Sequence, residues 1–258
     1  MASDNIYLLT ALPPLTESGS KPPLSLAELR AHVADSPTVA LVDAVLIGDD
    51  LLLREAALSG EAEASELPDP SVLGADQVRG RELLPDYLDG DEGGDGSARF
   101  ATDQLQARYF AHVGQVARRG GSQLLGAWQR FELGLRNALV GHRARTLGLD
   151  AASYQVAGDL VEPDPAIDAI VAQWAAAPDP LAGLQVLDHA RLAWLDERDP
   201  SYSFADDELV AYALRLLWIT RAWRLRQTSE GADPAGWTPG PAREGQMANR
   251  QGQEGLQL

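Results

Sequence analysis

Residues 123–147 (QLLGAWQRFELGLRNALVGHRARTL) constrain the fold most, because their apolar side chains recur at the spacing of one face of an α-helix. Glu132 and Arg136 stand four residues apart, in the order that stabilises a helix when both are exposed. Gly148 then predicts the end of the helix. A segment of this length and pattern predicts a protein built mainly from helices. Its apolar positions are Leu124, Trp128, Phe131, Leu135, Ala138 and Leu139.

Helical periodicity recurs along the rest of the chain, in segments that prolines and glycines separate. Gly120 and Gly121 separate two of these segments, so residues 102–119 and 123–147 should form an antiparallel hairpin. We therefore predict a mainly α fold, a helical bundle of antiparallel helices. The other predicted helices are residues 26–36, 38–58, 167–177, 181–198 and 203–226.

Local sequence signals mark some helix ends, but they do not decide between helix and strand for two segments. Ser25 and Glu28 form a capping box, and Ser203 and Asp206 stand at the same spacing before another helix. Residues 38–58 favour a helix, although their β-branched content also permits a strand. Residues 6–12 form an apolar run that is too short to decide between a strand and a buried turn of helix.

Changes in composition predict the domain organisation. Residues 1–227 are expected to form a single α-helical domain, with two lobes at about 1–97 and 98–227 as the alternative. Residues 228–258 are rich in Gly, Pro, Gln, Glu and Asn, which is typical of a disordered tail.

Residues 83–97 (LLPDYLDGDEGGDGS) predict an acidic, Gly/Asp-rich loop. Asp89, Asp91 and Asp95 offer the oxygen ligands that calcium prefers. However, an EF-hand template that starts at Asp89 has Phe100 where the bidentate glutamate belongs. We therefore expect a solvated acidic loop, Asp89–Gly96, rather than a calcium site.

The charge and the residue types that are missing exclude several classes of function. The net charge of −17 argues against general nucleic-acid binding, since phosphates would repel such a surface. The chain has no cysteine, which excludes disulfides and thiolate chemistry and fits a cytoplasmic protein. The N-terminal residues lack the basic start of a signal peptide, and no apolar run approaches the roughly 20 residues that cross a bilayer. We expect no direct membrane insertion.

The sequence contains no recognisable catalytic, cofactor or metal motif. The four histidines fall on four separate segments, and neither a P-loop nor a dinucleotide-binding motif occurs. The acidic pairs 49–50 and 206–207 look like loop or cap residues. We therefore expect a non-catalytic protein without a cofactor or metal. The alternative is an enzyme whose site assembles from His142, Asp188 and Glu132, which should then converge in one apolar-walled pocket.

Arginine and tryptophan supply the features that favour a protein partner. Both residue types are common anchors of interfaces, although tryptophans can equally form the core and arginines can cap a helix end. Asp188 and Arg191 stand one helical turn apart near Trp194. The basic cluster is Arg215, Arg221, Arg224 and Arg226, and the other tryptophans considered are Trp128, Trp174, Trp218 and Trp223.

Three separated blocks together carry a resemblance to a known family. The first block is residues 7–13 (YLLTALP) with residues 21–25 (KPPLS). The second is residues 128–148, with Trp128, Phe131-Glu132 and LRNAL. The third is residues 188–223, which begins with Asp188 and ends with Trp223. In order and spacing the blocks resemble a bacterial family of unknown function encoded in V-type (V/A-type) ATPase operons, where the gene for the C/d-type central-stalk component would stand.

This resemblance covers roughly residues 5–227 and implies a helical protein without catalytic residues. It implies a non-catalytic subunit or assembly factor of the V-type ATPase, a C/d-like central-stalk adaptor between the rotor shaft and the membrane ring. The partners would be rotor or central-stalk subunits and the proteolipid ring, which would place the protein at the cytoplasmic side of the inner membrane. The alternatives are a generic helical interaction scaffold and the enzyme above. Candidate partner-binding residues are Arg136, Arg215, Arg221 and Arg224.

Overall fold

The structure is a computed structural model that describes residues 2–60, 68–89, 100–158 and 164–231. The chain divides into two units, residues 1–223 and residues 224–258, and the fold described below is that of the first. The described residues are mainly helical and include no strand. The elements are α1 (Ala2–Ala11), α2 (Leu26–His32), α3 (Val39–Ser59), α4 (Ala75–Val78), α5 (Asp86–Asp89), α6 (Ala101–Gly120), α7 (Gln123–Thr146), η1 (Ala151–Tyr154), α8 (Pro165–Ala175), α9 (Pro180–Asp196) and α10 (Asp206–Gly231).

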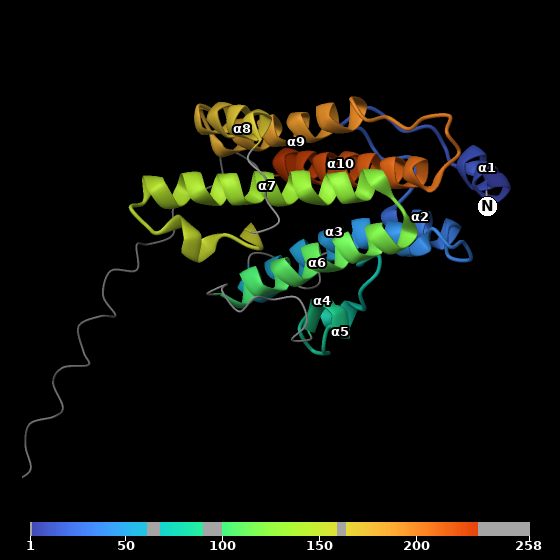
Figure 1. The fold of residues 1–258 in the computed structure, drawn as a ribbon, viewed down its shortest axis with the longest axis horizontal. Coiled ribbons are helices and arrows are strands. Elements are labelled where there is room, and N and C mark those ends of the chain that lie inside the picture. Colours follow the sequence, from blue (N-terminus) through green and yellow to red (C-terminus); the bar gives the residue numbers. More distant parts are fainter. Residues whose placement is uncertain (1, 61–67, 90–99, 159–163, 232–258) are drawn as a thin grey trace, which may run out of the picture. The chain divides into compact units, whose positions relative to one another are not determined.

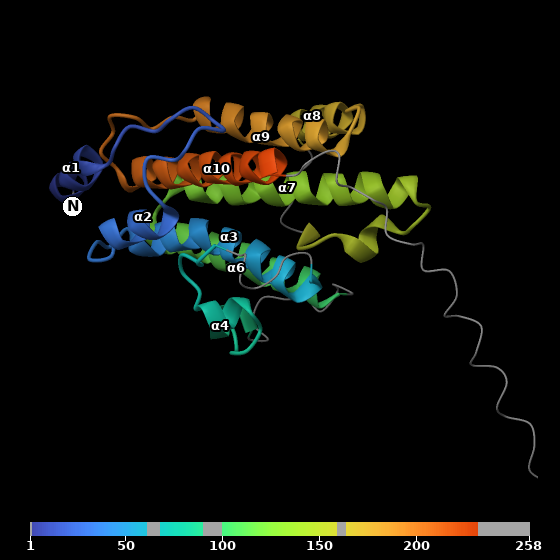
Figure 2. The same ribbon diagram turned by 180° about the vertical axis from the view of Figure 1, so that it is seen from behind.

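The predicted helical bundle is confirmed. Helices α6 and α7 form the expected antiparallel hairpin, in which Gly121 turns the chain with a φ of 69°. Helix α3 packs along α6, and α9 pairs with α8, which also packs on α7. Within the first unit, α8 and α9 lie on one side of α7 and α10, and α3 and α6 lie on the other (Figures 1 and 2). The residues ambiguous between strand and helix, 6–12 and 38–58, fall mostly within α1 and α3.

Helix α10 forms the centre of the main hydrophobic cluster. Because nearly every residue from 209 to 220 is buried, this stretch is covered on all sides and not only on one face. Side chains from α2, α3, α7, α8 and α9 pack in the same cluster. The buried apolar residues of α10 are Leu209, Val210, Ala211, Ala213, Leu214, Leu216, Leu217, Trp218 and Ile219.

Side-chain caps fix several helix ends. Ser25 and Glu28 form the predicted capping box of α2. Ser122 begins α7 by accepting the backbone N–H of Leu125, and the carboxylate of Asp207 accepts the N–H of Leu124. These contacts join the start of α7 to the start of α10.

Two predictions about acidic and capping residues are wrong. Helix α10 begins at Asp206 and not at Ser203, because Phe204 has a left-handed φ of 53° that no helix admits. Asp49 and Asp50 are not loop or cap residues, since both lie inside α3 and both are buried.

Several predictions fall on residues that the structure does not describe. Asp91, Asp95 and most of the predicted acidic loop lie outside the described residues, whereas Asp89 ends the short helix α5. Most of the predicted tail, residues 232–258, also lies outside them.

Candidate functional site

Arg191 is the centre of a partly buried ion-pair cluster that joins α7 and α9. Its Nε donates to Oε1 of Glu132 at 2.6 Å, and its Nη2 donates to Oε2 of the same carboxylate at 3.2 Å. Its Nη1 donates to Asp188 at 3.3 Å. The Arg191 side chain is only 13% exposed. Such two-pronged arginine–carboxylate pairs are strong and directional, so the cluster fixes the relative position of the two helices.

The same cluster continues into α10 and α3 through Trp218. The Arg191 guanidinium lies 4.3 Å from the centre of the Trp218 ring, and the guanidinium of Arg221 lies 4.7 Å from it. Arg221 donates from Nε to Oδ1 of the buried Asp49 at 2.9 Å. Charged groups from four helices therefore meet around one indole ring.

Burial and neighbouring charges oppose each other in this cluster. Burial raises the pKa of Asp188, while the nearby arginines act in the opposite direction. Burial alone would lower the pKa of Arg191, but the charges and hydrogen bonds of Glu132 and Asp188 raise it. Arg191 therefore remains charged, and its favourable placement depends on both carboxylates.

Further aromatic rings pack beside the Trp218 ring of this cluster, and Trp128 lies nearest with ring centres 6.2 Å apart. Trp194 stacks on Phe131 with ring centres 5.2 Å apart, and it meets Trp128 edge-on at 5.3 Å. Trp128 and Trp218 are 7% and 6% exposed. These two tryptophans are therefore part of the core. They are not exposed interface anchors, which was the other role that the sequence allowed for them.

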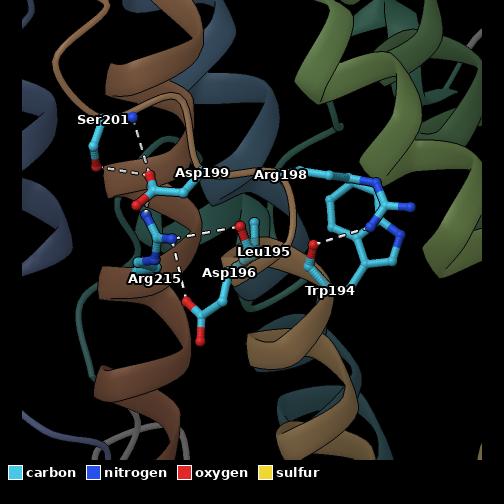
Figure 3. A network of polar contacts seen from close by, with 7 residues as sticks. All are labelled: Trp194, Leu195, Asp196, Arg198, Asp199, Ser201 and Arg215. Atoms are coloured by element: carbon cyan, nitrogen blue, oxygen red, sulfur yellow. Dashed lines mark hydrogen bonds and ion pairs between the residues drawn. The ribbon is translucent and has the colours of Figure 1, made fainter.

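The candidate partner-binding arginines make internal contacts. Arg136 donates to Asp103 at 2.5 Å, and Arg221 pairs with Asp49 as described. Arg215 reaches from α10 to the carboxylates of Asp196 and Asp199, each at 3.2 Å, as Figure 3 shows. Arg224 belongs to the second unit and also has an interaction partner. Partner binding by these four residues stays a prediction.

The three residues of the enzyme alternative do not converge in one pocket. Glu132 and Asp188 both contact Arg191, so the structure brings these two together. His142 lies on α7 ten residues after Glu132, about 15 Å along the helix axis at 1.5 Å per residue. Its ring meets the edge of Trp174 at 5.7 Å. The arrangement gives no support to a shared catalytic site of these three residues.

The three blocks of the resemblance meet through specific contacts. Glu132 of the second block pairs with Arg191 of the third. Tyr212 of the third block donates its hydroxyl to the Pro13 carbonyl of the first at 2.8 Å. His32, which follows the first block, contacts the Leu8 carbonyl at 2.9 Å. Residues that lie up to 199 positions apart therefore form one connected set.

Asp50 is a buried carboxylate that the sequence predicted only as a loop or cap residue. Its oxygens accept the backbone N–H groups of Ser71, Val72 and Leu73 at 2.7–2.8 Å. Burial raises the pKa of Asp50, and these three hydrogen bonds lower it again in part. The carboxylate ties the segment before α4 to the middle of α3. No local sequence motif predicts this role, because the N–H groups that Asp50 binds lie more than 20 residues further along the chain.

His112 predicts a measurable dependence of stability on pH. It stacks on Tyr87 at 4.1 Å, and burial, assisted by the charge of Arg119, lowers its pKa below the ordinary value of 6.5. Because the pKa of His112 is lower in the folded protein than in the unfolded chain, the unfolded chain takes up a proton more readily as the pH falls below 6.5. Protonation therefore favours unfolding, and the protein loses stability on acidification. We expect the melting temperature of His112→Phe, whose ring can still stack on Tyr87, to fall less between pH 7 and pH 5 than that of the wild type. A decline identical to that of the wild type would contradict this role.

The described residues show no membrane-spanning helix and no metal cluster. No helix among them is long and apolar enough to cross a bilayer. No three metal-binding side chains among them lie close enough together to hold an ion. No family model, no curated protein and no solved structure matches the chain.

Proposed function

We propose that the protein is a non-catalytic subunit or assembly factor of a bacterial V-type ATPase, an adaptor of the C/d type between rotor shaft and membrane ring. The observation that carries this proposal is that the three resembling blocks meet in one contact network. Glu132, Arg191, Tyr212 and Pro13 link them directly. The residues that carry the resemblance therefore lie together in the fold, although they are far apart in the sequence.

The packing suits a protein that transmits force by contact. An adaptor needs helices that hold their relative positions under load, and here partly buried ion pairs join α7 to α9 and α3 to α10. Arg215 makes a further link between α9 and α10. These links are directional, whereas apolar packing alone would resist sliding less specifically.

The charge of the chain predicts the kind of surface that its partner presents. With a net charge of −17, the protein should bind faces that are basic or mixed. Association should therefore slow as the salt concentration rises, because salt screens exposed charges beyond about 10 Å at 0.1 M ionic strength. The rotor shaft is the partner we expect to meet this surface.

Deletion of the gene in its native cell tests the proposal. We expect inverted membrane vesicles from the deletion strain to lose most ATP-driven ion pumping that belongs to the V-type enzyme, and a plasmid copy to restore it. Uncoupled ATP hydrolysis in the same vesicles would indicate a permanent subunit. A lower amount of assembled complex, with normal activity per complex, would indicate an assembly factor. Unchanged pumping and unchanged assembly would contradict the proposal.

A further inference from the structure

A cavity of about 400 Å³ lies beside the Arg191 cluster, between α3, α6, α7, α9 and α10. Small-molecule sites in proteins commonly occupy about 300–1,000 Å³ and often lie between the helices of a bundle. Its lining combines apolar side chains with charged groups. The apolar lining includes Val45, Leu52, Val113, Leu139, Val140 and Leu217.

The charged lining has more cations than anions. Four arginines face three carboxylates around this cavity, although the whole chain carries a net charge of −17. Two of the arginines, Arg136 and Arg191, are paired with carboxylates of the same lining. Arg221 pairs with Asp49, which does not itself line the cavity, and Arg143 and Glu55 complete the charged lining. The lining itself therefore holds one more arginine than carboxylates, while two of these arginines also pair with Asp49 and Asp188, which do not line the cavity.

Arg221 is the residue best prepared to bind an anion there. Its Nε donates to Asp49, but its Nη1 and Nη2 have no hydrogen-bond acceptor among the described residues. Its side chain is 21% exposed, and its guanidinium is held against the Trp218 ring. A guanidinium fixed in this way, with its terminal N–H groups unused, matches the geometry of a carboxylate or phosphate.

We propose that this cavity binds a small organic anion, with one carboxylate or phosphate head at Arg221 and an apolar body against Leu139 and Val140. The head would take the terminal N–H groups of Arg221, with Arg143 as a second positive charge. The apolar body would cover the apolar side chains that the helices leave open to the cavity. This binding is independent of the proposed role in the ATPase, so each can fail without the other.

Calorimetric titration of the purified full chain with octanoate, octyl phosphate, 1-octanol and octylammonium tests the charge preference. We expect octanoate or octyl phosphate to bind saturably, and octanol at least about tenfold more weakly, a difference of about 1.4 kcal/mol. Octylammonium should not bind. Tryptophan fluorescence should change with the same saturation, since Trp128 and Trp218 line the cavity. Equal affinity for octanol and octanoate, or no binding of either anion, would overturn the proposal.

Two variants and a matched control locate the site. Arg221→Gln should weaken octanoate binding about tenfold. Arg215→Gln should leave it unchanged, because Arg215 lies on the same helix with a similar exposure of 19% and does not line the cavity. If Arg221→Gln fails to fold because Asp49 loses this ion pair, Val140→Trp decides, since it fills the cavity and leaves the ion pairs intact. Undiminished octanoate binding by a folded Val140→Trp, or equal loss in both arginine variants, would contradict this site.

Discussion

Replacing Arg191 with leucine should lower the free energy of unfolding by about 3–5 kcal/mol. The guanidinium satisfies the carboxylates of Glu132 and Asp188, whose side chains are 17% and 20% exposed. Without it, two carboxylates of like charge remain close together in a poorly solvated place. Urea denaturation followed by circular dichroism measures the change directly.

A surface arginine provides the control for Arg191. Arg81 pairs with Asp76 at 3.5 Å, but its side chain is 68% exposed, so Arg81→Leu should cost less than about 1 kcal/mol. The triple variant, with leucine at Arg191, Glu132 and Asp188, should recover much of the lost stability. Neither carboxylate then remains in the cluster without a partner arginine. An Arg191→Leu variant no less stable than Arg81→Leu would contradict the structural role of the cluster.

Replacing Asp50 with alanine should cost about 3 kcal/mol of stability, since three buried or partly buried backbone N–H groups lose their acceptor. Asp50→Asn should rescue little, because its amide has one accepting oxygen and would turn its NH₂ group towards donors. Hydrogen exchange measured by NMR should show faster exchange at Ser71, Val72 and Leu73 in both variants.

Asp76→Ala serves as the control for Asp50. The Asp76 carboxylate is 50% exposed, and its ion pair with Arg81 is long at 3.5 Å. We expect this variant to lose less than about 1 kcal/mol and to leave the exchange of residues 71–73 unchanged. Exchange at these residues that stays slow in Asp50→Ala would show that the carboxylate is not what holds this segment.

The sequence predicted the helices well where their signals are local. Apolar spacing placed α6, α7, α8 and α9 within a few residues of their observed ends, and the capping box at Ser25 was correct. The start of α10 was missed, because its position depends on Phe204 in a left-handed conformation that composition does not reveal. Glu208 supports this conformation by accepting the Phe204 N–H at 2.7 Å.

The site was harder to predict because its contacts join distant parts of the chain. Asp188 and Arg191, which the sequence places one helical turn apart, form an ion pair at 3.3 Å. Glu132 and Arg136 stand at an equally good spacing, yet Glu132 pairs with Arg191 and Arg136 pairs with Asp103. Both side chains therefore pair with residues of other helices and not with each other. A two-pronged, partly buried pair such as Arg191–Glu132 is stronger than an exposed pair along one helix.

Affinity purification of the tagged protein from its native cell at low salt, followed by mass spectrometry, tests the proposed role in the V-type ATPase most directly. We expect rotor-shaft subunits to be recovered in amounts comparable with the protein, and fewer of them as the salt concentration rises. Recovery of the proteolipid ring together with the shaft would place the protein between them. Recovery of no ATPase subunit from cells that express the enzyme, or of an unrelated partner in their place, would contradict the proposal.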